Sequence, residues 1–283
     1  MYFSSMIRNY ILVLLLCTFT FATGQVTCSP ADRALYNIKI ESLKKMNASS
    51  MSDSIIAVGT SFLGTPYVEK TLEIGTTETL VINLRGLDCT TFVENVLAFT
   101  ATLNTDEKLF ADFTKNLETI RYRNGDLDGY PSRLHYFTEW IRDNEKIGLV
   151  KDITADLGGI ELEKSINFMG THRDLYPFLK DDENFKRIQE TEAELAKEVL
   201  CYLPQNEIQN QEHQIQSGDI IALATSIKGL DVTHTGFAIK QPNGRIHLLH
   251  ASSSGEVKIT KEPLADYLKN IKSNIGILVA RPL

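Results

Sequence analysis

The chain contains little cysteine, little tryptophan and no excess of positive charge. Its 283 residues include 4 Cys and 1 Trp, and 29 Lys and Arg stand against 36 Asp and Glu, for a formal net charge of −7. Without a basic excess, we expect no non-specific binding to nucleic acid or to an anionic membrane. The hydrophobic fraction of 43% and the charged fraction of 23% are ordinary for a globular protein, and they exclude an extensively disordered chain.

Long hydrophobic runs are also missing, except at the N-terminus. Residues 10–22 form an apolar run that follows Arg8 and leads into small residues. This pattern is typical of a cleaved secretory signal peptide over residues 1–24, with an uncleaved anchor as the alternative. The run is shorter than the roughly 20 residues that a comfortable transmembrane helix needs. We therefore expect a periplasmic or secreted protein whose mature chain, residues 25–283, has no membrane span.

The mature chain would keep three cysteines: Cys28, Cys89 and Cys201. In an oxidising compartment at most one pair can close within the molecule, so one thiol stays free. Cys28 and Cys201 can form that pair only if the fold brings them together, which spacing does not decide. Cys89 could equally be a buried apolar residue, half of a disulfide or a nucleophile.

The order of hydrophobic patterns predicts helices first and a sheet afterwards. Apolar residues have helical spacing over residues 89–103 and 106–120, and a further helical face runs from Phe185 to Leu200. Past Gln216 the pattern becomes that of β-strands, at residues 219–224, 232–240, 245–251 and 275–280. This order predicts an α+β fold in one domain, with the helices packed on one face of an antiparallel sheet.

Cys89 follows a residue that suits the start of a helix. Asp88 is a good N-cap, and the helical apolar pattern begins just after it. Unpaired backbone N–H groups and the helix dipole at such a position favour a thiolate, and the same N–H groups can hold an oxyanion. A cysteine hydrolase needs this arrangement, although a cysteine with no catalytic role can also stand near a helix start.

Two of the six histidines occupy adjacent strands of one expected hairpin. Pro242 followed by Asn243 and Gly244 favours a three-residue loop. In that register His250 lies opposite Gly236, which makes it a diagonal neighbour of His234 on the same face. A cysteine nucleophile needs a histidine base and a group that orients it, and these two histidines can supply both. A histidine on a strand face is nevertheless more often a surface or core residue than a catalyst.

The remaining histidines are weaker candidates for catalysis or metal binding. His247 and His250 fall on opposite faces of a strand, which disfavours a metal pair there. His135 and His172 lie in an irregular middle region and are expected to be structural or to contact substrate. No metal ion or organic cofactor is expected.

Five segments in order resemble the NlpC family of papain-like cell-wall cysteine hydrolases. They are LGTPYV (63–68), LDCTTFV (87–93), SGDII (217–221), THTGFAI (233–239) and LHASSSGEV (249–257). The resemblance implies a papain-like core, with Cys89 as nucleophile, His234 as general base and His250 as the group that orients it. It also implies an oxyanion site formed by the Cys89 N–H and the Tyr67 hydroxyl.

The spacing of these segments departs from the usual family pattern. A large insertion, at about residues 105–213, separates Cys89 from His234, and EKTLE (69–73) replaces a glycine-rich segment. These departures resemble the divergent N-acetylmuramoyl-L-alanine amidase-like branch. Membership would imply cleavage of the amide between muramic acid and L-alanine, favouring 1,6-anhydro-muropeptides. The residues that would contact the substrate are Asp88, Arg133, His135, Tyr136, Trp140 and Ser252, since aromatic faces suit sugars and arginine suits carboxylates.

Peptidoglycan fragments are thus the expected partner of a secreted, monomeric cysteine amidase. Two alternatives stay open. One is an endopeptidase of the same fold that cuts the γ-D-glutamyl–diamino-acid bond, which the altered EKTLE segment disfavours. The other is a periplasmic muropeptide-binding protein without activity, which an intact Cys89, His234 and His250 disfavour. A metal-dependent amidase is a more distant class, because the chain has no paired ligand motif.

Overall fold

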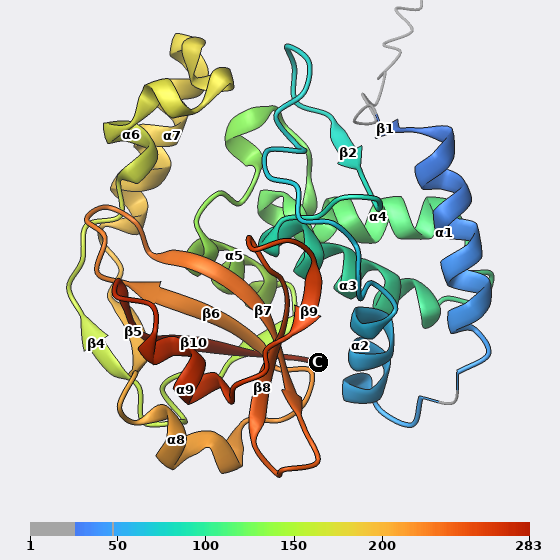
Figure 1. Ribbon diagram of the computed structural model, residues 1–283. Helices are drawn as coiled ribbons and strands as arrows, with labels where there is room; N and C mark the ends of the chain where they lie inside the picture. Colours follow the sequence, from blue (N-terminus) through green and yellow to red (C-terminus); the bar gives the residue numbers. More distant parts are fainter. Residues whose placement is uncertain (1–25, 47) are drawn as a thin grey trace, which may run out of the picture.

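The computed structural model describes residues 26–46 and 48–283 (Figure 1). The expected signal peptide, residues 1–24, lies outside this part of the chain. Within it one antiparallel sheet holds eight strands, in the order β4-β5-β10-β6-β7-β8-β9, with β3 also paired to β10. The strands are β3 Val150–Asp152, β4 Ile160–Leu162, β5 Leu200–Pro204, β6 Ile220–Thr225, β7 Val232–Lys240, β8 Ile246–Ala251, β9 Val257–Ile259 and β10 Asn274–Pro282.

Helices precede, interrupt and follow the strands of this sheet. They are α1 Pro30–Leu43, α2 Met51–Thr60, α3 Cys89–Leu103, α4 Phe110–Arg121, α5 Phe137–Lys146, α6 Phe168–Thr171, α7 Asp182–Leu195, α8 Ile208–Gln211 and α9 Leu264–Lys269. A separate parallel pair joins β1 Val26–Cys28 to β2 Leu80–Ile82. The α+β class predicted from the pattern is confirmed. The four predicted strands match β6, β7, β8 and β10 to within two residues at each end, whereas β9 was not predicted.

Two local predictions need correction. The helix expected from residue 106 begins at Phe110, because Lys108 takes a positive φ of 55° that no helix interior contains. The helical face expected to reach Leu200 ends with α7 at Leu195, and Leu200 opens strand β5. Apolar residues between a helix and a buried strand fit both the helical spacing and that of a strand. The pattern therefore could not show where the helix ends and the strand begins.

The sheet is covered on both faces, not on one as predicted. Alternate residues of the strands β6, β7, β8 and β10 enter two separate cores, because successive side chains of a strand point to opposite faces of the sheet. Phe237 and Leu249 face α3, while Ala238 and Leu248 face α9. The pattern missed α9, because six residues are too few to show a helical period.

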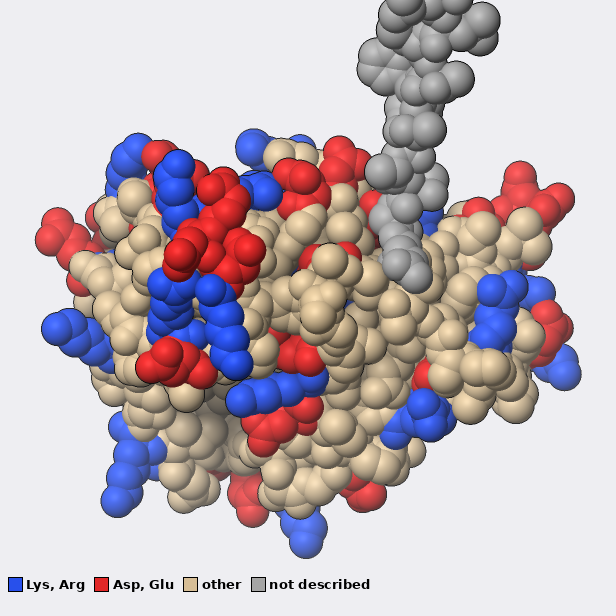
Figure 2. Space-filling model, turned by 90° about the horizontal axis from the view of Figure 1, so that it is seen from above, with Lys and Arg blue, Asp and Glu red and all other residues tan. Residues whose placement is uncertain are grey.

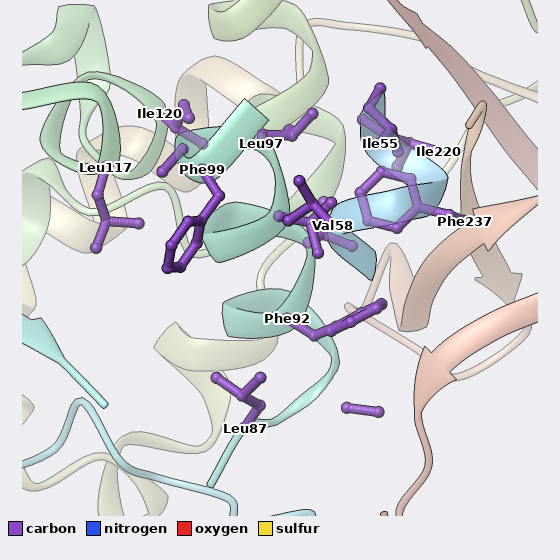
Figure 3. Packing of buried hydrophobic residues seen from close by; sticks show 14 of the residues in the cluster. Ile55, Val58, Leu87, Phe92, Leu97, Phe99, Leu117, Ile120, Ile220 and Phe237 are labelled. Carbon is purple, nitrogen blue, oxygen red and sulfur yellow. The ribbon is translucent and has the colours of Figure 1, made fainter. Parts of the chain in front are cut away.

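Helix α3 is the centre of the larger core. Its Phe92 is fully buried and meets Phe237 of β7 edge to face, with ring centroids 5.8 Å apart. Figure 3 shows Phe92, Leu97 and Phe99 along α3, with α4 on one side and both α2 and the sheet on the other. This packing fixes the N-terminal end of α3 against β7, and therefore fixes Cys89 near the histidine strand.

The long segment between Cys89 and His234 is built into the sheet. Strand β10 pairs with β6 along one edge and with β3 and β5 along the other, and β3 and β5 belong to the expected insertion. The insertion also carries a small core of its own around Tyr130, Phe178 and Ile188. Figure 1 shows α6 and α7 at the upper left, beyond the end of the sheet.

Charges of both signs are mixed on the outer surface. On the face seen in Figure 2, lysine and arginine side chains alternate with aspartate and glutamate. None of the helices in residues 26–46 and 48–283 is both long and apolar enough to span a bilayer.

Candidate active site

Cys89 is the first residue of α3, and its position is set by a capping box. Asp88 is the N-cap, and its Oδ1 accepts from the Thr91 N–H at 2.8 Å, while the Asp88 N–H donates to the Thr91 hydroxyl at 2.9 Å. The capping role predicted for Asp88 is therefore confirmed. The Cys89 N–H, in the first turn, has no intrahelical partner and is free to hold an oxyanion.

The electrostatics of Cys89 differ from the sequence expectation. Burial, followed by the neighbouring Asp88 carboxylate, raises the pKa of the Cys89 thiol to about 11, against the opposing effect of Thr90 and Thr235. The helix start was expected to favour a thiolate, but desolvation outweighs it. At neutral pH the group is a thiol.

The hairpin of β7 and β8 has the predicted three-residue loop and the predicted register. Gln241 pairs with Arg245 across the loop, and Phe237 faces Leu249. In that register the His234 and His250 rings meet, with Nε2 of His234 2.6 Å from Nδ1 of His250 and the rings nearly perpendicular at 88°. Gly236 leaves the room they need, since a Cβ there would lie 2.8 Å from Cβ of His250.

Both imidazoles are held neutral. Burial lowers the pKa of His234 to about 4, and burial, His234 and Lys258 together lower that of His250 to about 3. The His250 ring, only 1% exposed, lies between His234 and the Tyr267 ring of α9, and its buried Nε2 has no hydrogen-bond partner among the described residues.

Thr235 connects the two halves of the site. Its hydroxyl donates to the Cys89 carbonyl at 3.0 Å, which ties the start of α3 to the strand that carries His234. Within the described residues, the Cys89 sulphur makes no hydrogen bond to His234. Nε2 of His234 contacts His250, whereas its Nδ1 has no hydrogen-bond partner among the described residues.

Cys89 opens into a cavity of about 280 Å³. Tyr67 lines it, and burial raises the pKa of its phenol to about 12, with smaller contributions from Cys89 and Asp88, so the hydroxyl stays a donor. The remaining lining residues are Glu69, Lys70, Leu72, Glu73, Asp88, Thr90, Arg133, Leu175 and Tyr176. The structure therefore brings Cys89, Tyr67, Asp88 and Arg133 of the predicted site to one cavity, whereas neither His234 nor His250 is among its lining residues.

Four other predicted contacts with substrate fall outside the cavity. Trp140 is fully buried and stacks on Phe137, and the Tyr136 hydroxyl donates to Glu192 in a separate core. The His135 ring bonds the Tyr130 carbonyl, and Ser252, 5% exposed, bonds Ser254. These side chains serve packing and loop closure. The aromatic pattern that suggested sugar recognition was the pattern of a core helix.

Glu73, Leu175 and Tyr176 line the cavity but were not predicted. Glu73 lies in the EKTLE segment, whose departure from the family pattern was the only signal of its importance. Leu175 and Tyr176 come from the insertion, about 85 residues along the chain from Cys89. No local pattern reports a contact over that separation.

The other cysteines and histidines give no second centre. Cys28 and Cys201 stay free and lie on strands of different sheets, so the pairing left open above does not form. His247 is buried and bonds the Thr260 carbonyl at 2.8 Å. Within the described chain, no three His, Cys, Asp or Glu side chains are placed to hold a metal ion. A larger cavity of about 850 Å³ lies between α5 and α7 and is lined by none of the catalytic candidates.

A cysteine at a helix start, tied through Thr235 to a strand whose histidine contacts a second histidine, is the arrangement expected of a papain-like α+β hydrolase. The chain belongs to the AmiA-like, or N-acetylmuramoyl-L-alanine amidase-like, family, whose sequence model matches residues 57–277. At the level of the family it is an amidase of peptidoglycan. No curated protein matches the chain significantly.

Solved structures agree on the fold. An N-acetylmuramoyl-L-alanine amidase from Bacteroides uniformis is 37% identical with a TM-score of 0.78, covering 82% of this chain and 99% of its own. A Bacteroides fragilis protein provisionally named a xylanase is 42% identical with a TM-score of 0.75, covering 80% and 99%. A Legionella pneumophila protein assigned to the family DUF1460 is 26% identical with a TM-score of 0.67, covering 90% and 97%.

Proposed function

We propose that the protein is a secreted or periplasmic cysteine amidase that cleaves the bond between N-acetylmuramic acid and L-alanine in peptidoglycan fragments, including 1,6-anhydro forms. The observation that supports this most strongly is the 2.6 Å contact between His234 and His250 beside a cysteine at a helix start. The family match and the amidase from Bacteroides uniformis supply the substrate class.

The reaction begins with a neutral thiol and a neutral imidazole. Nδ1 of His234 takes the thiol proton as Sγ of Cys89 attacks the lactyl carbonyl carbon, and the C=O bond becomes a C–O⁻ bond. The Cys89 N–H and the Tyr67 hydroxyl donate to this oxyanion. His234 then gives its proton to the alanine nitrogen, the C–N bond breaks, and a thioester remains on Cys89.

Water completes the cycle. His234 removes a proton from a water molecule that attacks the thioester, and the C–S bond breaks to release the muramic carboxylic acid and restore the thiol. His250 acts through His234. With its Nδ1 accepting from Nε2–H of His234, it keeps the lone pair on Nδ1 of His234, the nitrogen that must act as the base.

Product analysis tests the proposal. The mature protein is incubated in reducing buffer with an anhydro-muropeptide, and the products are identified by mass spectrometry. A released peptide that begins with L-alanine is the expected result, and Cys89→Ala should abolish it. Release of L-Ala-γ-D-Glu would instead assign the endopeptidase activity. Absence of any turnover, or turnover that survives Cys89→Ala, would contradict the cysteine mechanism, and loss of activity with a chelator would indicate a metal enzyme.

A further inference from the structure

Arg133 does not present a free positive charge to the cavity. Its Nη2 lies 2.9 Å from Oε1 of Glu73 and 3.1 Å from Oε2 of Glu78. Glu78 is almost fully buried and also accepts from the Tyr122 hydroxyl at 2.8 Å. Two carboxylates therefore compensate one guanidinium. The sequence suggested that Arg133 binds a carboxylate of the substrate, but this arrangement disfavours one.

Glu73 keeps unused capacity to accept hydrogen bonds. A carboxylate offers about four lone-pair positions, and Arg133 is the only donor that Glu73 meets within the described residues. Oε2 of Glu73 and Nε of Arg133 are both buried without a partner. Buried polar atoms of this kind are uncommon and call for an explanation such as a water or a ligand. Glu73 lines the cavity and 14% of its side chain is exposed, so a molecule bound in the cavity can reach its carboxylate.

Part of the cavity wall is aromatic and apolar. Leu175, 53% exposed, and Tyr176 line it, and both belong to the insertion. Burial raises the pKa of Tyr176 to about 12, and the next contribution comes from the Glu73 carboxylate, so the phenol is a neutral group near Glu73. A carboxylate and an aromatic side chain in one cavity suit a ring that carries hydroxyl groups and has an apolar face. The volume of about 280 Å³ is at the small end for ligand pockets.

The charges of the side chains that line the cavity indicate which part of the substrate binds there. Three carboxylates, from Glu69, Glu73 and Asp88, line the cavity against two cations, Lys70 and Arg133. A stem peptide that carries a glutamyl carboxylate meets repulsion there. A saccharide that is neutral and rich in O–H and N–H donors does not.

We infer that Glu73, positioned by Arg133, is a specificity-determining residue that accepts hydrogen bonds from the saccharide on the acyl side of the scissile amide. This inference rests on the proposed function and names the part of the substrate that the Glu73 cavity holds. Glu73 takes no part in the proton transfers. It discriminates a lactyl amide that carries the sugar ring from one that lacks it.

Two matched substrates test the inference. One is N-acetylmuramoyl-L-alanyl-D-isoglutamine, and the other is (R)-lactoyl-L-alanyl-D-isoglutamine, which has the same scissile amide and peptide but no ring. We expect Glu73→Gln to lower kcat/KM for the first by about 10- to 100-fold, the range for losing a hydrogen bond to a charged group, and for the second by less than about threefold. Glu41→Gln, on the exposed side of α1, is the control and should change neither.

An equal loss on both substrates would overturn the inference, because it would mean that Glu73 only supports the fold. Cleavage of neither substrate by the wild-type protein would instead count against the proposed function. A binding measurement then decides the inference independently. In the Cys89→Ala background, Glu73→Gln should weaken the Kd of the muramoyl compound by about 10-fold or more and leave that of the lactoyl compound unchanged. Equal affinities in the presence and absence of Glu73 would contradict it.

Discussion

Nε2 of His234 and Nδ1 of His250 lie 2.6 Å apart, and this contact assigns a different task to each ring. His234 has one nitrogen occupied and one available, whereas His250 is enclosed between His234 and Tyr267. We therefore propose that His250 is a positioning residue and that His234 carries out the proton transfers.

Replacing His250 tests that division. We expect His250→Ala to lower kcat by about 10²- to 10⁴-fold with little change in KM, because the imidazole of His234 loses its preferred tautomer and orientation. His250→Asn, which keeps a polar atom near Nε2 of His234, should recover part of the loss. Steady-state kinetics on the muramoyl dipeptide measure both variants. A KM effect as large as the kcat effect would argue for substrate binding by His250 instead.

The pH dependence of the reaction should reflect a neutral resting pair. With the pKa of His234 at about 4, the base stays unprotonated from pH 5 to 8, and kcat/KM should be nearly constant over that range. With the pKa of the Cys89 thiol at about 11, alkylation by iodoacetamide should be slow at pH 7 and should accelerate up to and beyond pH 9. Peptide mapping by mass spectrometry separates Cys89 from Cys28 and Cys201. Rapid labelling of Cys89 at pH 5 would reveal a thiolate–imidazolium pair.

Stability should fall in mild acid because of His250. Its pKa is about 6.5 in the unfolded chain and about 3 when folded, so the unfolded state binds the proton more readily between these values. The contribution is fully present above pH 6.5 and is lost as pH falls towards 3. Between pH 6.5 and 5 the loss is on the order of 2 kcal/mol. Urea unfolding at pH 7.5 and pH 5 should show a smaller difference for His250→Gln than for the wild-type protein. An identical difference would show that other groups control the acid response.

Gly236 is needed because of the space it leaves. A methyl group there would lie 2.7 Å from the Leu249 carbonyl oxygen and 2.8 Å from Cβ of His250, so Gly236→Ala must separate β7 from β8. We expect a loss of stability of about 1–3 kcal/mol and a lower kcat. Thermal unfolding and steady-state kinetics measure the two effects. Thr233→Ala, at an exposed position of the same strand, is the control and should change stability by less than about 0.5 kcal/mol.

The buried ion pair of Arg121 and Glu94 makes α3 dependent on α4. Nε of Arg121 lies 2.6 Å from Oε2 of Glu94, and both side chains are at most 2% exposed. Arg121→Met leaves the carboxylate unpaired and should cost about 3–5 kcal/mol. The double replacement of Arg121 by Met and Glu94 by Leu should recover much of that loss, as measured by urea unfolding. Lys115→Ala, which breaks an exposed pair at 3.8 Å, should have little effect. A double variant no more stable than the single one would show that packing, not charge, is limiting.

The parts of the site that could be predicted from the sequence are local ones. The loop at Pro242 and Gly244 fixes the register of β7 and β8, and register alone brings His234 and His250 to one face. The cap at Asp88 is likewise a property of four consecutive residues. Such features depend on residues that are adjacent in the sequence, so the sequence alone is enough to predict them.

The rest depends on contacts that are distant in the chain. Arg133 contacts Glu78, which is 55 residues away in the sequence. The sequence therefore could not show that a carboxylate compensates the charge of Arg133. The pKa of Cys89 is governed by desolvation, which appears only once α3 has packed on the sheet. Trp140 and Tyr136 have the composition of a sugar site, but tertiary packing makes them core residues.

Both edges of strand β10 are paired, and this limits how the chain can be shortened. One of its edges is bonded to β6, next to the histidine hairpin, and the other to β3 and β5 from the middle of the sequence. Excising residues 105–213 would strip that second edge of its partners and leave its N–H and C=O groups exposed to aggregation. Residues 105–213 therefore cannot be removed without disrupting the sheet. A smaller enzyme with the same chemistry would need a new way to close that side of the sheet.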